Sequence, residues 1–207
     1  FPSYYYTGGE VLGVAIEKDG EKDYIYFPCE KTEIERALKR IGAGDISECN
    51  KNIDFCGGDE EWEDYFNDLL QKNDLESVNA ISSAINCLGA NLDAISKNLY
   101  KLSAVMEFAG VTTADTEKVI RLAEYLDEFE YYREIGNDYN LGTKLIENEI
   151  GSAAEKIGDY IDYEKYAQDF LEENGGAYTK YGDVVYLRDD QSLSEILGEN
   201  EIKMGGI

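Results

Sequence analysis

Carboxylates and tyrosines dominate the residues of this sequence that could do chemistry. In GDYIDYEKYAQDF (158–170) there are four acids and one base, and Tyr160, Tyr163 and Tyr166 recur at every third position. Two carboxyl groups brought together can act as the acid and the base or nucleophile of a glycosidase. With 44 Asp and Glu in the chain, however, neighbouring acids are expected anywhere, so the pattern has little specificity for a hydrolase.

Other common active sites require residue types or spacings that the sequence lacks. There is no histidine, which excludes Ser-His and Cys-His dyads. Neither GGEVLG nor GAGD has the phosphate-loop pattern. Residues 19–23 lack the ligand spacing of a calcium loop, and the four cysteines have no CxxC spacing. We therefore expect free thiols, no metal, no cofactor and no enzymatic activity.

The net charge of the chain is −25, from 44 acids and 19 bases. A charge of magnitude about 2–8 keeps a small domain in solution, and a larger one destabilises the compact state by self-repulsion. We infer that the excess has a use. The acidic charge points away from nucleic acid and anionic lipid, and toward a basic partner surface, cations or solubility under stress. The hydrophobic content of 43% predicts a folded chain despite the charge.

Neither a membrane span nor a secretion signal is expected. No apolar run approaches the roughly 18–20 residues that cross a bilayer. The first ten residues, FPSYYYTGGE, lack the basic region and the long apolar core of a signal peptide. These observations predict a cytoplasmic protein.

The expected elements make an α+β fold of three small modules. The first, residues 1–57, is an α/β module with a hairpin over 11–28 that turns at Asp19-Gly20. A helix follows that is capped by Thr32 and stopped by Gly42 or Gly44. Residues 46–55 are expected to form a third strand.

The second module, residues 58–132, is expected to be helical. A helix over 59–72, capped by Asp59, has an apolar stripe of Trp62, Tyr65, Phe66 and Leu69. Residues 75–109 have apolar positions three and four apart, and Gly89 interrupts them, so two short helices packed as a hairpin are favoured over a coiled coil. A further helix is expected over 112–132, with Val119, Leu122, Leu126 and Phe129 facing inward.

The third module, residues 133–207, is expected to be α+β. Helices are predicted over 140–151, which ends at Gly151, and over 161–176, with Asp162 as its N-cap and Gly175-Gly176 as its stop. Two short strands are predicted within 177–187, with a turn at residues 181–183. The C-terminal residues are expected to be weakly helical.

Three clusters of acids form the candidate binding surface. They recur on predicted helices, where side chains three or four residues apart are neighbours. Their expected orientation is outward, with the tyrosines of 158–170 packed inward or at a module junction. The candidate residues are Asp59, Glu60, Glu61, Glu63, Asp64, Asp68, Asp115, Glu117, Glu124, Asp127, Glu128, Glu130, Glu134, Asp138, Asp159, Asp162, Glu164, Asp169, Glu172 and Glu173.

The amount of charge is comparable to that of a short DNA duplex. Duplex DNA carries one charge per about 1.7 Å, so 25 net charges correspond to roughly 42 Å of duplex. Carboxylates on a helix are also spaced on a scale similar to that of phosphates along a strand. The alternative is a solvated acidic surface with no particular arrangement.

A pattern of acids and tyrosines also runs through residues 140–187. It consists of Leu141-Gly142, Leu145, Glu147 and Glu149, then YIDYE (160–164) with Tyr166 and Asp169, then Tyr181-Gly182. This pattern resembles the C-terminal part of the ArdA-type antirestriction proteins. Residues 89–103 and the hairpin that ends in Phe27-Pro28 are similar to other parts of that family, so the resemblance covers most of the chain.

The resemblance implies an acidic DNA mimic encoded on a mobile genetic element. Proteins of this family are elongated, consist of three modules and dimerise. They occupy the DNA-binding groove of type I restriction–modification enzymes, where their carboxylates take the place of phosphates. The partners expected from the resemblance are such an enzyme and a second copy of this chain, with no nucleic acid and no membrane.

Two other functions stay open at the level of the sequence. The first is an acidic interaction module within a larger mobile-element protein, which binds a different basic partner and inhibits nothing. The second is a carboxylate-dependent hydrolase, which would need a concave site with two converging acids and a raised pKa.

Overall fold

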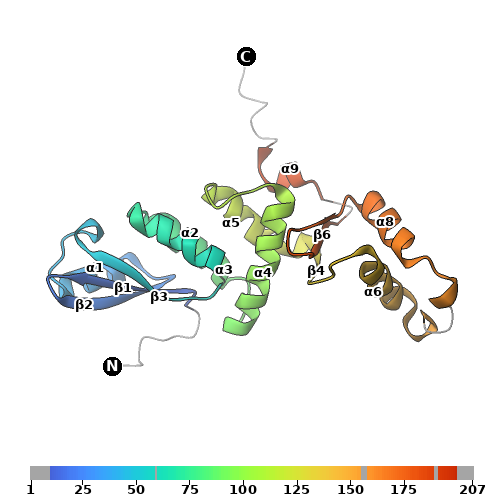
Figure 1. Cartoon of the computed structure of the whole chain (residues 1–207). Helices are drawn as coiled ribbons and strands as arrows, with labels where there is room; N and C mark the ends of the chain where they lie inside the picture. The colour runs from blue at the N-terminus through green and yellow to red at the C-terminus, as the bar shows by residue number, and fades with distance from the viewer. Residues whose placement is uncertain (1–9, 59, 155–157, 189–190, 200–207) are drawn as a thin grey trace, which may run out of the picture. The chain divides into compact units, whose positions relative to one another are not determined.

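The computed structural model describes residues 10–58, 60–154, 158–188 and 191–199 (Figure 1). These residues form eight α-helices and two three-stranded antiparallel sheets, which confirms the predicted α+β class. Contacts within the chain define two compact units, Phe1–Tyr100 with Thr113–Ala123, and Lys101–Thr112 with Glu124–Ile207. The three-module layout is not confirmed, and its boundaries stay predictions.

The first sheet has the strand order β2-β1-β3. Its strands are β1 (Leu12–Lys18), β2 (Glu21–Phe27) and β3 (Asn50–Cys56). Asp19 and Gly20 join β1 to β2 with φ of 51° and 88°. A two-residue turn with positive φ at both positions matches the twist of a hairpin, and Asp-Gly suits it. The predicted hairpin is confirmed.

The helix after the hairpin begins earlier than expected. The N-cap of α1 (Lys31–Arg40) is Glu30, and Glu33 accepts a hydrogen bond from the Glu30 backbone N–H at 3.3 Å. The prediction of Thr32 as the cap is therefore wrong. The side chain of Glu33, in the first turn of the helix, satisfies the backbone N–H of Glu30, and this allows Glu30 to be the N-cap. Gly42, with φ of 69°, follows the helix end as predicted.

The third strand is shorter than the predicted range of 46–55. Residues Ile46–Glu48 form a 3₁₀ turn, η2, and β3 begins at Asn50. The cause is local, because the Asp45 side chain accepts from the Ser47 N–H at 2.9 Å and caps the turn. The strand prediction is correct from Asn50 onward.

Three helices that follow the first sheet in sequence begin and end close to their predicted limits. They are α2 (Glu60–Gln71), α3 (Leu75–Asn86) and α4 (Leu92–Ala109), and the expected cap Asp59 lies outside the described residues. The break between α3 and α4 confirms the prediction of two separate helices and rules against one long coiled-coil helix. Instead of lying along α4 as a hairpin, α3 packs mainly against α2 and β2.

The segment after α4 contains the largest departure from the sequence prediction. The expected helix over 112–132 is α5 (Thr116–Glu124), followed by the 3₁₀ turn η3 (Leu126–Glu128) and a strand, β4 (Phe129–Tyr132). Phe129 is buried, as expected, but in a strand that pairs with β6 (Val184–Leu187). Aromatic residues favour strands when a partner is present, and this partner is more than fifty residues away.

The second sheet has the order β4-β6-β5, with β5 at Ala177–Tyr178. Its helices are α6 (Asp138–Ile150), α8 (Tyr163–Asn174) and α9 (Leu193–Ile196), with the 3₁₀ turns η4 (Gly151–Ala153) and η5 (Gly158–Tyr160) between α6 and α8. In the described part of the chain, no helix has both the length and the apolar composition of a membrane span.

The predicted N-cap of α8 and the predicted glycines at the ends of α6 and α8 are confirmed. Asp162 accepts from the Lys165 N–H at 3.1 Å at the start of α8, and Gly151 and Gly175 follow the two helices with positive φ. The predicted strands within 177–187 are confirmed, although their pairing with β4 was not foreseen.

A close approach at Gly142 joins α6 to α8. A Cβ at this position would lie 2.0 Å from the Tyr163 carbonyl oxygen, so only glycine fits. The contact sits above a small core made by Leu141, Leu145 and Ala167. Glycine here sets how closely the two helices can pack.

Gly142→Ala should therefore destabilise the second unit. The added methyl must displace backbone rather than a flexible side chain, which predicts a loss of about 1–3 kcal/mol in the free energy of unfolding. Urea unfolding followed by circular dichroism measures the change. Glu172→Ala, on the exposed side of α8, is the control and should change stability by less than about 0.5 kcal/mol. Equal midpoints for Gly142→Ala and the unchanged protein would contradict the assignment.

Candidate acidic surface

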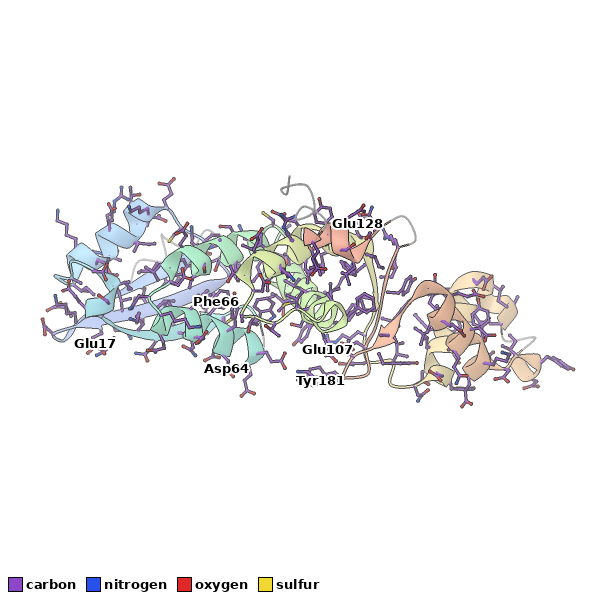
Figure 2. The ribbon with its side chains drawn as sticks, turned by 90° about the horizontal axis from the view of Figure 1, so that it is seen from above. Glu17, Asp64, Phe66, Glu107, Glu128 and Tyr181 are labelled. Carbon is purple, nitrogen blue, oxygen red and sulfur yellow. The ribbon has the colours of Figure 1, made fainter. Side chains whose placement is uncertain are left out.

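Helix α2 separates its acids from its aromatic residues most clearly. Trp62, Tyr65 and Phe66 are buried, whereas the five acids of the helix are all exposed. Figure 2 shows the Asp64 side chain pointing away from the helix on the outside and Phe66 lying within the unit. The acids are Glu60, Glu61, Glu63, Asp64 and Asp68. The predicted outward orientation is correct for this helix.

The buried side of α2 holds the helix in place through ring contacts and one hydroxyl pair. The rings of Trp62 and Tyr65 lie 6.0 Å apart, edge to face, and those of Tyr65 and Phe66 lie 5.9 Å apart. The Tyr65 hydroxyl lies 3.0 Å from the Thr116 hydroxyl of α5. Burial raises the pKa of Tyr65. The acids on the other side are therefore carried by a firmly packed helix.

The charge of α2 is little compensated along its own length. Residues 59–71 contain no base, and Lys72 pairs with Asp68 at 2.6 Å. The carboxylates of Glu60, Glu63 and Asp64 occupy i, i+3 and i+4 positions, where Cβ atoms are about 5–6 Å apart. This face of α2 is the densest part of the candidate surface.

The second cluster, residues 115–138, is not one helical face. Asp115 and Glu117 belong to the first unit, and Glu124 onward to the second. Glu130 lies on β4 and pairs with Arg188 at 2.8 Å, and Glu117 pairs with Arg121 at 3.5 Å. The prediction that the acids of residues 115–132 lie on a helix is wrong in part, because Glu128 lies in the 3₁₀ turn η3 and Glu130 on the strand β4.

Several residues of the second cluster are also less exposed than predicted. The half-buried ones are Asp115, Glu128, Glu130 and Asp138. Asp138 accepts from the Tyr178 hydroxyl at 2.9 Å and from the Gln168 amide at 2.8 Å. Both of its oxygens are thus engaged inside the second unit, which makes Asp138 a structural acid rather than a contact residue.

The third cluster is exposed on α8 and the turn before it. Asp159, Asp162, Glu164, Asp169, Glu172 and Glu173 all face solvent. Asp162 is occupied as the N-cap, and Asp169 pairs with Lys165 at 3.0 Å. The remaining four carboxylates are those available to a partner by this criterion.

The tyrosines of this segment do not behave alike. Tyr166 is half-buried and donates to Glu149 at 2.6 Å, a bond that raises its pKa. Tyr163 is half-buried as well, but Tyr160 is 90% exposed. The prediction that all three pack inward or at a module junction is wrong for Tyr160, because it lies exposed in the 3₁₀ turn η5 and not on the helical stripe.

One structural acid was not recognised from the sequence. Asp183 is buried, and its carboxylate accepts from the Glu134 N–H at 2.7 Å and the Tyr131 hydroxyl at 3.1 Å. Burial, and then the neighbouring Asp183 charge, raise the pKa of Tyr131. The only signal in the sequence was its position next to the Gly182 turn, which does not reveal the partners.

The charge is unevenly distributed along the chain. Residues 1–57 hold 11 acids and 7 bases, whereas residues 58–207 hold 33 and 12. Lys18 of β1 pairs with Glu48 of η2, and Arg40 of α1 pairs with Asp23 of β2. The candidate surface therefore begins at α2 and excludes the hairpin.

Within the described residues, the acids do not converge into a metal site. No group of three or more His, Cys, Asp or Glu side chains there is placed to hold a metal ion. Glu107 lies beside the β5–β6 turn that carries Tyr181 (Figure 2), where it accepts from the Lys180 N–H at 2.6 Å, again a structural contact.

Comparison with known proteins adds no relative. No protein-family model matches the chain, and no curated protein matches it. The likeness to antirestriction proteins consequently depends on the residues quoted above.

The second unit should lose stability at alkaline pH. Burial raises the pKa of Tyr131, Tyr178 and Tyr186, so the folded state favours the neutral phenol. Tyrosines of the unfolded chain ionise near pH ~10. The stability that the three neutral phenols give the folded state is therefore complete below that pH, and it is lost as the pH rises through their pKa values in the folded state. Urea midpoints at pH 9, 10 and 11 should fall in that order.

Tyr131→Phe isolates the tyrosine contribution to this fall. The variant lacks one ionising group, so its midpoint should fall less between pH 9 and 11 than that of the unchanged protein. Tyr160→Phe, at an exposed position, should leave the profile unchanged. Cys29, whose thiol pKa is raised to about 12 by burial, is present in all three proteins and cancels in the comparison. Parallel profiles for Tyr131→Phe and the unchanged protein would contradict the interpretation.

Proposed function

We propose that this protein is a DNA mimic that occupies the DNA-binding groove of a type I restriction–modification enzyme and so acts as an antirestriction protein. The observation that carries the proposal is the face of α2, where Glu60, Glu63 and Asp64 are exposed at helical spacing above a buried aromatic layer. The exposed acids of α8 extend the same kind of surface to the second unit.

The physical basis is substitution of carboxylates for phosphates. Enzymes that bind duplex DNA gain much of their affinity from Lys and Arg side chains placed against phosphates, with release of counterions. A helix that carries acids at positions three and four apart, with Cβ atoms about 5–6 Å apart, offers these bases negative charge at a similar spacing. Electrostatic attraction then also speeds association with the groove.

The direction of the acids favours binding over catalysis. A hydrolase needs two acids that converge in a concave site, with at least one raised pKa. The candidate acids on α2 and α8 instead point to solvent from the outer faces of packed helices. We propose no catalytic residue, no cofactor and no metal, and, from the family resemblance, a homodimer as the active form.

The decisive experiment is competition with duplex DNA. A type I restriction–modification enzyme bound to labelled duplex is titrated with the purified protein at about 50 mM salt and again at about 200 mM. The protein should displace DNA at low salt and do so far less well at high salt, because ion pairs at a surface are screened. Failure to displace DNA at low salt would overturn the proposal.

Neutralising the face of α2 should weaken the competition. In Glu60→Gln/Glu63→Gln/Asp64→Asn, three charges are removed without changing size. Each exposed charge pair contributes ~0.2–1 kcal/mol, so the three together predict a loss of roughly tenfold in affinity. The matched control, Glu17→Gln/Glu21→Gln/Glu35→Gln, removes three exposed acids from the first sheet and α1 and should lose much less.

The same pair of variants separates the proposal from a general acidic effect. Equal losses in both would mean that net charge alone matters, and would remove α2 from the contact surface. A pull-down from the host that returns another basic protein and no restriction subunit would favour the alternative of a non-inhibitory interaction module.

A further inference from the structure

One asparagine of α8 is followed directly by a glycine, and this pair of residues is reactive in an open chain. Of the asparagines in the sequence, only Asn174 precedes a glycine. The backbone nitrogen of the next residue can attack the side-chain carbonyl carbon of an asparagine, and a glycine has no side chain that hinders the attack. Asn174 is the last residue of α8, and Gly175 is its C-cap. The reactive pair therefore lies where a helix ends.

Hydrogen bonds at the end of α8 hold the two reacting groups apart. The Gly175 N–H donates to the Leu171 carbonyl oxygen, and the Asn174 side-chain amide donates to the Phe170 carbonyl oxygen at 2.8 Å. Side chains of a helix point toward its N-terminus, so the second bond draws the Asn174 amide away from the Gly175 nitrogen. That nitrogen must also lose the proton that it donates to Leu171. Reaction therefore requires that both hydrogen bonds open.

Water can reach this pair from the surface. Gly175 is exposed and Asn174 is half-buried, and the two residues before them, Glu172 and Glu173, are exposed as well. The protection therefore comes from the hydrogen bonds and not from exclusion of water. The last turn of a helix frays more easily than its middle. The end of α8 can thus open while the rest of the second unit stays folded.

We propose that Asn174 is a site of spontaneous deamidation that the C-cap of α8 keeps closed, and that the reaction releases this end of the helix. When the cap opens, the Gly175 nitrogen gives its proton to hydroxide and attacks Cγ of Asn174. A bond forms between this nitrogen and Cγ, the Cγ–Nδ2 bond breaks, and ammonia leaves with a proton taken from water. Water then adds to one carbonyl of the cyclic imide and opens it to aspartate or isoaspartate.

The product does not fit the cap that held the asparagine. A carboxylate at position 174 has no proton to donate to the Phe170 carbonyl oxygen and repels it instead. The added charge also lies at the C-terminus of a helix, where negative charge is unfavourable, and the last turn of α8 contains no base. Isoaspartate lengthens the backbone in addition. Deamidation therefore destabilises the end of α8.

The chain after the cap is closely packed, so the change reaches the second sheet. A Cβ on Gly176 would lie 2.8 Å from the Leu171 side chain and 3.2 Å from the Tyr186 Cβ. Gly176 leads directly into β5, where Ala177 pairs with Val185 of β6. A longer or displaced backbone before Gly176 disturbs this pairing. The site acts as a one-way device that loosens α8 from the edge of the sheet.

The test measures the deamidation rate of Asn174 in the full chain. The protein is incubated at pH 8 in native buffer and in unfolding urea, and mass spectrometry follows the tryptic peptide 166–180, in which Asn174 is the only asparagine. The native protein should react at least about tenfold more slowly, the factor that corresponds to a local opening free energy of ~1.4 kcal/mol. Equal rates in the two conditions, or an inert Asn174 in urea, would overturn the proposal.

Two glycine variants separate opening of the cap from a general loss of stability. Gly176→Ala places a methyl group against Leu171 and should speed deamidation of the native protein severalfold. Gly151→Ala, at the end of α6 where φ is 58°, strains the same unit elsewhere and should leave the rate unchanged. No acceleration by Gly176→Ala, or equal acceleration by both variants, would overturn control by the cap. Circular dichroism checks that both are folded, and the comparison of native buffer with urea does not depend on them.

A further pair of variants tests the effect of the product. Asn174→Asp should lower the urea midpoint below that of Asn174→Ala, which also lacks the amide donor but adds no charge. Equal midpoints would overturn the claim that the reaction releases the helix end. None of these measurements involves a restriction enzyme, so their outcome is independent of the DNA competition and of the proposed function.

Discussion

Repulsion among the acids is the constraint on which the structure depends. A net charge of −25 opposes any compact state, so each acidic face needs a buried layer that holds it. In the first unit that layer is the aromatic side of α2, with Trp62, Tyr65 and Phe66 buried together. In the second unit it is the small core around Leu141 and Ala167. Burial of apolar side chains stabilises the folded state whatever the net charge, so it can offset the repulsion among the acids.

The acids divide into two groups with different physical roles. One group completes the fold: Asp183 and Asp138 receive hydroxyl and N–H donors from distant elements, and Asp162 caps α8. The other group, which includes Glu60, Glu63 and Asp64 on α2 and Glu164, Glu172 and Glu173 on α8, is exposed to solvent. Only the second group is available to a basic partner. The charge that a partner could contact is therefore smaller than the net charge, and it lies mainly on residues that follow the first sheet in sequence.

Local signals in the sequence predicted most elements correctly. The Asp19-Gly20 turn, the Asp162 cap and the glycines after α6 and α8 act within a few residues, so their effect can be recognised without the fold. The outward acids of α2 were equally predictable, because helical periodicity separates them from the aromatic stripe. The failures have a different origin: β4 was mistaken for helix since its partner β6 is distant in sequence, and Tyr160 leaves the helical stripe because η5 precedes α8.

The sequence by itself determined the α+β class, the acidic character and the candidate acids on α2 and α8, because composition and short-range periodicity decide these properties. Tertiary structure alone decided which acids are structural, since the partners of Asp138 and Asp183 come from elements that only folding brings near. It also decided that the ring of Tyr139 lies against that of Tyr163, next to a backbone contact at Gly142 that no local pattern encodes. The physical reason is that hydrogen bonds and close packing act over a few ångströms in space, whatever the separation along the chain.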